Sequence, residues 1–278
     1  MGRMTSGRVP AALVAVALLL GGAACDGDIE DSHAPQGAES ADGGIPLDQI
    51  ERDRPRSSDR RARPSLEELE REGGICRPHG TRADCADVPV AARPDALALW
   101  RRTVEFFPPA VLAHLDTFVL LPRGQGGGVA EDGRGSYSFS VGFPDDGNVD
   151  HVLIHELGHA FEVTSHREFF ATWRDRYWSP ADTRRVNVYA QRRSGSLADN
   201  PVYRAAPDRF VHPYAAASPS EDFAETFRWF VLGVKPTGDS VKEQKIRDLW
   251  ADPDLVAARA RIQQARRDHP GPLVSVRD

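Results

Sequence analysis

Two histidines and a glutamate stand close together in the run His155-Glu156-Leu157-Gly158-His159. On an α-helix, residues four apart share a face, so both imidazoles can reach one metal ion. Glu156 is turned by about 100° from His155, toward the place where a water on that metal would lie. The spacing is typical of half a hydrolytic zinc site, with two ligands and a base but no third ligand.

The residues around these three side chains predict the helix that would carry them. They are mostly apolar and recur at helical spacing: Val149, Val152, Leu153, Ile154, Leu157, Ala160 and Phe161. This pattern predicts a nearly buried helix over about 149–162. Imidazole and carboxylate groups need partners in such surroundings. The alternative to a metal site is a pair of core histidines held by backbone carbonyls, with an unrelated glutamate beside them.

Two other histidines are weaker candidates for the third ligand. His151 precedes His155 by one turn, but histidines at i, i+4 and i+8 span about 12 Å of helix. Zinc–nitrogen bonds of about 2.0–2.1 Å cannot gather both ends of that row. We therefore expect His151 to line the site or to orient a ligand, and we expect His166 at the surface.

A better candidate is Glu221, in a second segment with helical character. Ser218 and Pro219 are typical of a helix N-cap and first helical position. Glu221 and Glu225 then lie on one face, one turn apart. An alternative is that Glu221 completes a capping box with Ser218 while Glu225 faces solvent. This segment alone does not decide between a ligand and a cap.

Taken together, the two segments resemble the catalytic domain of anthrax lethal factor and its relatives, the secreted Pro-Pro endopeptidases of the gluzincin type. The resemblance lies in His-Glu-Leu-Gly-His-Ala, then a tyrosine, then Glu-Asp-Phe-Ala-Glu-Thr-Phe-Arg. Those enzymes take their third zinc ligand from the first glutamate of a Glu-x-x-Ala-Glu helix. They place a catalytic tyrosine seven residues before it, the spacing of Tyr214 and Glu221 in this chain.

The resemblance implies one Zn²⁺ per chain, bound by His155, His159 and Glu221. It makes Glu156 the general base and Tyr214 the donor that stabilises the oxyanion. By the same resemblance Glu225 orients a zinc ligand. The match covers roughly residues 115–250. It departs at Asp222, where an aromatic or aliphatic residue is common, so Asp222 stays open as another ligand.

The resemblance implies an α+β, zincin-like metallopeptidase fold, mostly helical, with a small sheet whose edge strand borders the active-site cleft. We expect a zinc-dependent endopeptidase in which Zn²⁺ lowers the pKa of water toward about 7 and Glu156 takes its proton. The partner is then a protein or peptide substrate. Two other functions stay open: a non-catalytic, zinc-containing surface-binding lipoprotein, and an amidase of cell-wall peptides. The net charge of −6 decides between none of them.

The N-terminus predicts export from a bacterial cell. A basic start, an apolar run over 9–20 and small residues up to position 24 are typical of a signal peptide, residues 1–24. The small residues before Cys25 resemble a lipoprotein box, in which that cysteine is lipidated and anchors the chain to the outward face of the membrane. The box departs from its usual form at Gly22, so ordinary cleavage after Ala24 and secretion stay open.

The region after the signal peptide divides into a tether and a folded domain. Residues 25–65 contain almost no large apolar side chains, which predicts a disordered tether, and residues 66–278 suit one metallopeptidase domain. Lipidation of Cys25 would leave Cys76 and Cys85 to form a disulfide in an oxidising compartment. The alternative for that pair is a metal site with His79.

Further elements follow from periodicity. Alternation over 136–143 predicts a strand. Because the resemblance places such a strand beside the cleft, we expect it to be the edge to which a substrate peptide adds; the alternative is an ordinary sheet strand with glycines in its turns. The glycines of the stretch 123–147 are too irregularly spaced to match a nucleotide-binding pattern, and no nucleic-acid partner is expected. The remaining expected elements are a strand over 117–121 and helices over 94–107, 167–177, 240–250 and 252–267.

Overall fold

The computed structural model describes residues 73–144, 148–192, 199–270 and 273. It is a mixed α+β structure, as the sequence predicts, with one five-stranded sheet and a larger set of helices. The expected signal peptide, Cys25 and the expected tether lie outside the described residues. Within the described part, no helix is both long and apolar enough to cross a membrane.

The sheet has the strand order β2-β1-β3-β5-β4. Only β3 and β5 run parallel, and the other neighbours are antiparallel. The strands are β1 (Gly74–His79), β2 (Arg82–Asp84), β3 (Leu115–Leu120), β4 (Gly127–Glu131) and β5 (Tyr137–Val141). The disulfide between Cys76 and Cys85 joins β1 to the residue after β2.

The edge strand is not the one expected from the sequence. Tyr137, Phe139 and Val141 are buried on one face of β5, which confirms the alternating pattern. However, β5 pairs with β3 on one side and with β4 on the other, so the prediction that it forms the edge is wrong. The edge on this side of the sheet is β4, which comes from the glycine-rich stretch and was not predicted as a strand. Gly133 and Gly135 adopt positive φ in the turn that pairs β4 with β5.

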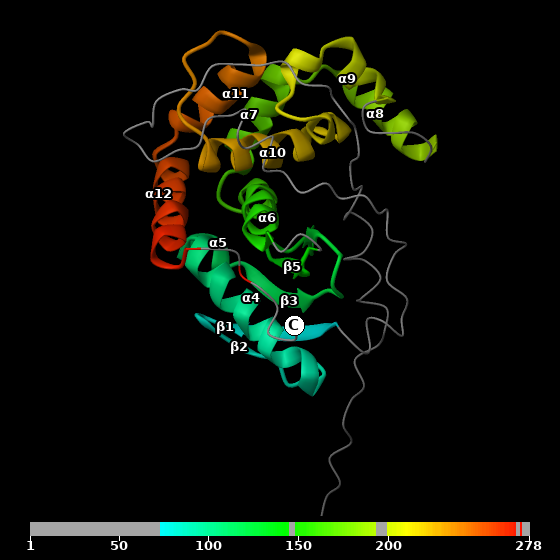
Figure 1. Cartoon of the computed structure of the whole chain (residues 1–278). Coiled ribbons are helices and arrows are strands. Elements are labelled where there is room, and N and C mark those ends of the chain that lie inside the picture. The colour runs from blue at the N-terminus through cyan, green and yellow to red at the C-terminus, as the bar shows by residue number, and fades with distance from the viewer. Residues whose placement is uncertain (1–72, 145–147, 193–198, 271–272, 274–278) are drawn as a thin grey trace, which may run out of the picture.

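The helices agree closely with the periodicity. All expected helices are present within a residue or two of their predicted ends (Figure 1), while α5, α8, α9 and the short 3₁₀ helices were not predicted. The α-helices are α4 (Arg93–Phe106), α5 (Pro109–Leu112), α6 (Val149–Val163), α7 (Arg167–Tyr177), α8 (Pro180–Arg192), α9 (Pro201–Ala205), α10 (Pro219–Leu232), α11 (Val241–Trp250) and α12 (Pro253–Asp268). The 3₁₀ helices are η2 (Val90–Ala92), η4 (Pro207–Arg209) and η5 (Pro213–Ala217).

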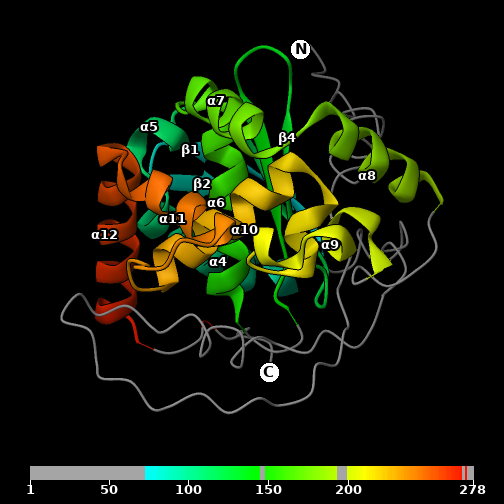
Figure 2. The ribbon, with the colours of Figure 1, turned by 90° about the horizontal axis from the view of Figure 1, so that it is seen from above.

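Helix α6 lies between the sheet and the upper helices (Figure 1), and α10 crosses it when the molecule is seen from above (Figure 2). Gly158 sets the distance between these two helices. A Cβ atom at position 158 would lie 2.7 Å from the Cα of Ala224, closer than side chains approach a backbone. Only glycine therefore allows α10 to approach α6 this closely.

A buried ion pair holds the first turn of α6. The guanidinium of Arg102 in α4 donates to both carboxylate oxygens of Asp150, at 2.9 and 2.7 Å. It also donates to the backbone oxygen of Ala265 in α12. Breaking one partner of such a buried pair typically costs about 3–5 kcal/mol. Helices α4, α6 and α12 are thereby joined at the end of α6 that precedes the two histidines.

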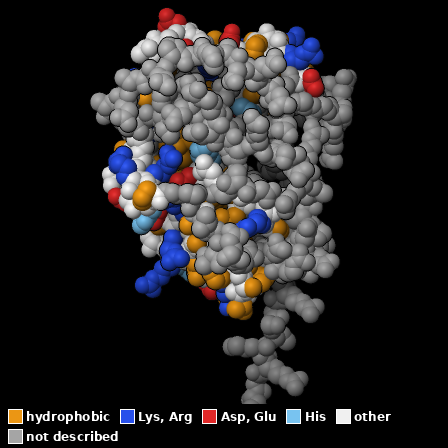
Figure 3. Space-filling view, in the orientation of Figure 1, with side chains coloured by type: hydrophobic (Ala, Val, Ile, Leu, Met, Phe, Trp, Pro, Cys, Tyr) orange, Lys and Arg blue, Asp and Glu red, His pale blue; other side chains and the backbone are white. Residues whose placement is uncertain are grey.

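The face of the molecule seen in Figure 3 shows hydrophobic side chains in its lower half, at the level of α4 and the sheet. Among the described residues, the exposed large hydrophobic side chains are Val90 and Leu97. The apolar core is otherwise well covered, with Trp100 of α4 against Phe118 of β3 at 5.4 Å between ring centroids. The large apolar side chains of α4 and the sheet are therefore mostly used in packing.

Candidate metal centre

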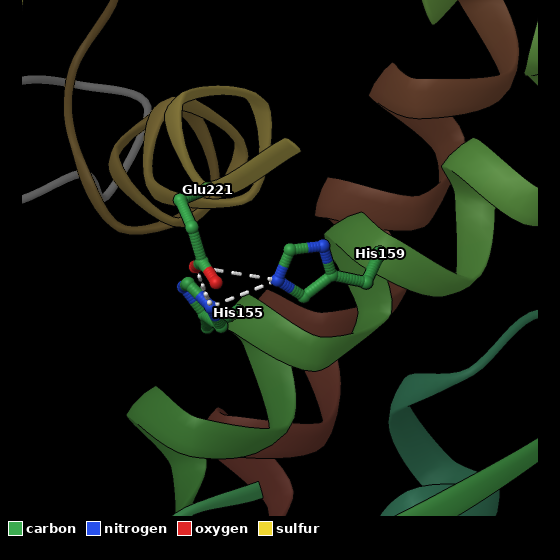
Figure 4. Close-up of side chains that lie close together, drawn as sticks. All are labelled: His155, His159 and Glu221. Carbon is green, nitrogen blue, oxygen red and sulfur yellow. Dashed lines mark hydrogen bonds and ion pairs between the residues drawn. The ribbon is translucent and has the colours of Figure 1, made fainter. Parts of the chain in front are cut away.

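The local start of α10 positions Glu221. Ser218 caps the helix, because its hydroxyl accepts a hydrogen bond from the backbone N–H of Glu221 at 3.0 Å. Pro219 occupies the first helical position, as predicted. The carboxylate of Glu221 extends away from this cap to the two histidines of α6 (Figure 4), so the capping-box alternative is wrong.

Three donor atoms from two helices meet at one point (Figure 4). The Nε2 atoms of His155 and His159 are 3.1 Å apart. Oε2 of Glu221 lies 3.2 Å from Nε2 of His155 and 3.5 Å from Nε2 of His159. The structure therefore brings the three predicted ligands together as an almost equilateral triangle.

The triangle fits a tetrahedral zinc ion. Bonds of about 2.0–2.1 Å at tetrahedral angles separate neighbouring ligand atoms by about 3.3 Å. The three observed separations of 3.1, 3.2 and 3.5 Å lie around that value. Two imidazoles and one carboxylate are also ligands that Zn²⁺ commonly takes in catalytic sites, where a fourth position stays open.

Strong electrostatic coupling marks the same three side chains. Burial lowers the pKa of His155, but hydrogen bonds to Glu221 and Glu225 more than offset this and raise it to about 9. Burial also lowers the pKa of His159, but the nearby Glu221 and Glu162 raise it more, so the pKa lies well above its ordinary value. The pKa of Glu221 is lowered, since the two histidines outweigh the opposing effect of burial. A metal cation bound between these side chains would supply the positive charge that protons on the two histidines supply in its absence.

The remaining ring nitrogen of His155 contacts Glu225. Nδ1 lies 2.9 Å from Oε1 of that carboxylate, while Arg228 donates to the other oxygen at 2.6 Å. Glu225 is almost fully buried. This geometry directs Nε2 of His155 toward Glu221, which is the orienting position that the resemblance implies for Glu225.

His159 has an equivalent arrangement that the sequence reasoning missed. The hydroxyl of Ser220 lies 2.9 Å from Nδ1 of His159 and donates to Oε2 of Glu162 at 2.5 Å. Glu162 follows His159 by three residues, and Ser220 precedes Glu221 directly. These sequence positions could have predicted the arrangement, because they place the Glu162 and Ser220 side chains beside the proposed ligands once the two helices pack together.

We expect Ser220→Ala to weaken zinc binding by about 10–100-fold, the usual effect of removing an orienting partner of a metal-binding histidine. The hydroxyl fixes which nitrogen of His159 carries the proton, and alanine cannot replace it. Zinc affinity is measured by competition with a chromogenic chelator. Ser165→Ala is the matched control, because that exposed serine contacts His166 away from the site. Equal affinities in both variants would contradict the orienting role.

Glu156 lies beside the triangle and under the edge strand. Its side chain is 5% exposed, and burial raises the pKa of its carboxyl group. A Cβ atom on Gly127 of β4 would lie 2.7 Å from Cγ and 2.8 Å from Oε1 of Glu156. Arg167 pairs with Glu131 and ties the far end of β4 to the start of α7. Glycine at position 127 therefore makes room for the carboxylate next to the sheet edge.

If Glu156 is the base that the resemblance implies, we expect Gly127→Ala to displace its carboxylate and to lower the kcat of peptide hydrolysis by about 10–100-fold, the scale of a misplacement near 1 Å. Zinc content should stay unchanged, because the atoms nearest to a Cβ at that position belong to Glu156 and Val152, not to the proposed ligands. Gly126→Ala is the control, since a Cβ atom there meets nothing within 4 Å. Kinetics of both variants on one peptide test this, and equal kcat values would show that Glu156 tolerates the methyl group.

Tyr214 approaches the site from η5. His212 is the N-cap of this short helix, and its Nδ1 accepts a hydrogen bond from the backbone N–H of Tyr214 at 3.0 Å. The ring of Tyr214 lies 5.8 Å from that of His155, centroid to centroid. The predicted site residues outside α6 are Tyr214, Glu221 and Glu225, and all three lie next to His155.

Two expectations about neighbouring residues are settled by the packing. His166 is buried rather than at the surface, since its ring packs edge-on against Phe161 with centroids 4.8 Å apart. The helix break between α6 and α7 turns this side chain inward, which the polar neighbours in the sequence did not indicate. Asp222 accepts from Lys245 and Trp178, so it is engaged away from the metal triangle.

Fold and site together define a mixed α+β chain with a His-His-Glu donor set and an adjacent buried carboxylate. Comparisons with protein-family models, with curated proteins and with solved structures give no match. The functional assignment therefore depends on the geometry above and on the motifs that place it.

Proposed function

We propose that this chain is a zinc-dependent endopeptidase of zincin-like fold, with His155, His159 and Glu221 as the zinc ligands. The observation that carries the proposal is the triangle of donor atoms, whose separations suit one tetrahedral ion. A purely structural zinc site is disfavoured because such sites take four protein ligands. The His-His-Glu triangle has three, with an acidic side chain beside it.

The chemistry divides between the ion and the side chains. When bound, Zn²⁺ supplies a Lewis acid that acidifies water and polarises a carbonyl group. Glu156 accepts the proton of the attacking water and returns it to the leaving amine. Its burial suits this role, because a carboxyl group with a raised pKa exchanges protons more readily near neutral pH.

Tyr214 has a different task in the proposed reaction. Its phenol donates a hydrogen bond to the peptide carbonyl oxygen as negative charge develops there. The tyrosine is half-buried and its ring lies against that of His155, on the side from which η5 approaches. A donor held there acts without needing solvent to reorganise.

The sheet edge suggests how a peptide substrate is held. Strand β4 pairs with β5 on one side only, and its Gly127 lies directly against Glu156. An extended peptide can add to such an edge through backbone hydrogen bonds, which brings its carbonyl groups past the base. This replaces the expectation, based on the sequence, that residues 136–143 provide the edge.

Incubating the purified protein with an unstructured peptide library, with and without 1,10-phenanthroline, tests the proposal. We expect about one zinc ion per chain and peptide cleavage that the chelator abolishes. Purified peptidoglycan serves as the second substrate, since release of its peptides alone would indicate a cell-wall amidase. Bound zinc without turnover on either substrate would support the surface-binding lipoprotein instead.

We also propose that the enzyme works outside the cytoplasm, tethered through lipidated Cys25. The disulfide between Cys76 and Cys85 supports this, because such bonds persist mainly in oxidising compartments. Cys25→Ser is then expected to move the protein from the membrane fraction to the soluble fraction. The mass of the mature N-terminal peptide checks the anchor, and an unmodified Cys25 would exclude it.

A further inference from the structure

A buried lysine contacts the residue that directly follows Glu221. Nζ of Lys245 in α11 lies 2.5 Å from Oδ2 of Asp222, and both side chains are 0% exposed. The same Nζ donates to the backbone oxygen of Arg209 at 2.8 Å. A single ammonium group thus binds two points of the chain that are 13 residues apart.

The surroundings of this ammonium group exclude water. The ring of Phe210 lies 4.5 Å from Nζ, and those of Trp173 and Tyr177 lie at 5.6 and 5.7 Å, centroid to atom. The indole N–H of Trp178 donates to the same oxygen of Asp222, at 2.8 Å. Hydrogen bonds to a charged group are stronger in such low-dielectric surroundings.

The two points bound by Lys245 lie on either side of Tyr214 and Glu221 in the sequence. Arg209 precedes Tyr214 by five positions, and Asp222 directly follows Glu221. The intervening segment contains η5 and the first residues of α10. The two ends of this segment, residues 209 and 222, are therefore held close together because both bind the ammonium group of Lys245.

We propose that Lys245 is a positioning residue that fixes Tyr214 relative to Glu221 by holding residues 209 and 222 together. The catalytic consequence rests on the proposed endopeptidase function, whereas the structural link does not. A simple packing role would not require a charge, since apolar residues often replace a buried ion pair without loss of stability. An apolar side chain, however, cannot bind a carboxylate and a carbonyl oxygen at once.

The test uses the double variant Lys245→Met with Asp222→Asn. Lys245→Met alone would leave Asp222 buried without its counter-charge and is expected to unfold the protein. The double variant removes both charges at nearly constant volume, so it is expected to fold with a melting temperature close to wild type. Lys242→Met, on the same helix but outside this cluster, is the matched control.

Hydrogen exchange followed by mass spectrometry gives a readout that needs neither metal nor substrate. In the double variant we expect the amides of residues 210–217 to exchange on the order of tenfold faster, while those of α6 keep wild-type rates. Lys242→Met should change neither region. Unchanged exchange over 210–217 in a folded double variant would overturn the proposal.

Kinetics then test the catalytic consequence. Tyr214→Phe should cost about 10²–10³-fold in kcat in the wild-type background but less than about threefold in the double variant, with zinc content unchanged. If Tyr214→Phe lowered kcat by the same factor in both backgrounds, Lys245 would not act through Tyr214. A wild-type protein without zinc or turnover would refute the proposed function, and the exchange experiment would still decide whether Lys245 holds the segment.

Discussion

Replacing Glu156 with glutamine is expected to lower kcat by about 10²–10⁴-fold, the usual contribution of a general acid–base group. Zinc should stay at one ion per chain, because Glu156 lies beside the donor triangle rather than within it. Glutamine has nearly the same shape but cannot accept a proton at neutral pH. Zinc content by mass spectrometry and kinetics on the first cleavable peptide give the two readouts.

Glu221→Ala is the counterpart of that variant. It removes one of the three proposed ligands, so most of the zinc should be lost along with activity. Loss of zinc from Glu156→Gln would instead place Glu156 among the ligands. Zinc retained in Glu221→Ala would move the third ligand to Glu225, since Asp222 is already bound by Lys245 and Trp178.

The sequence predicts the site well where the information is local. The spacing of His155 and His159 and the Ser-Pro start before Glu221 each determine a helix face within one segment. The structure brings these two faces together as the resemblance implies. Gly158 allows α10 to approach α6 closely. A glycine inside a helix, however, does not by itself indicate that another helix packs against it.

The rest depends on contacts between distant segments. The order of strands in a sheet is decided by long-range pairing, so the alternation of residues 136–143 predicts a strand without saying which neighbours it has. The edge strand β4 is rich in glycine and carries almost no hydrophobic pattern. Lys245 has no sequence signal at all, because its partner lies 23 positions away and buried lysines are rare.

The sequence prediction of Tyr214 rests on a seven-residue spacing to Glu221, and the packing now gives it a physical basis. His212 accepts from the backbone N–H of Tyr214, while Lys245 holds the chain five residues before it. These contacts fix the backbone on which the phenol is carried. The ring lies against that of His155, so the hydroxyl is held on an ordered segment next to the proposed zinc ligands.

Tyr214→Phe removes one hydroxyl and little volume, so it separates chemistry from packing. If the hydroxyl donates to the oxyanion, we expect kcat to fall by about 10²–10³-fold, with zinc retained and KM little changed. Burial of the ring would be preserved in phenylalanine, so the melting temperature should stay near wild type. A tyrosine that serves only packing would give the reverse pattern, and a kcat within about twofold of wild type would remove Tyr214 from the catalytic assignment.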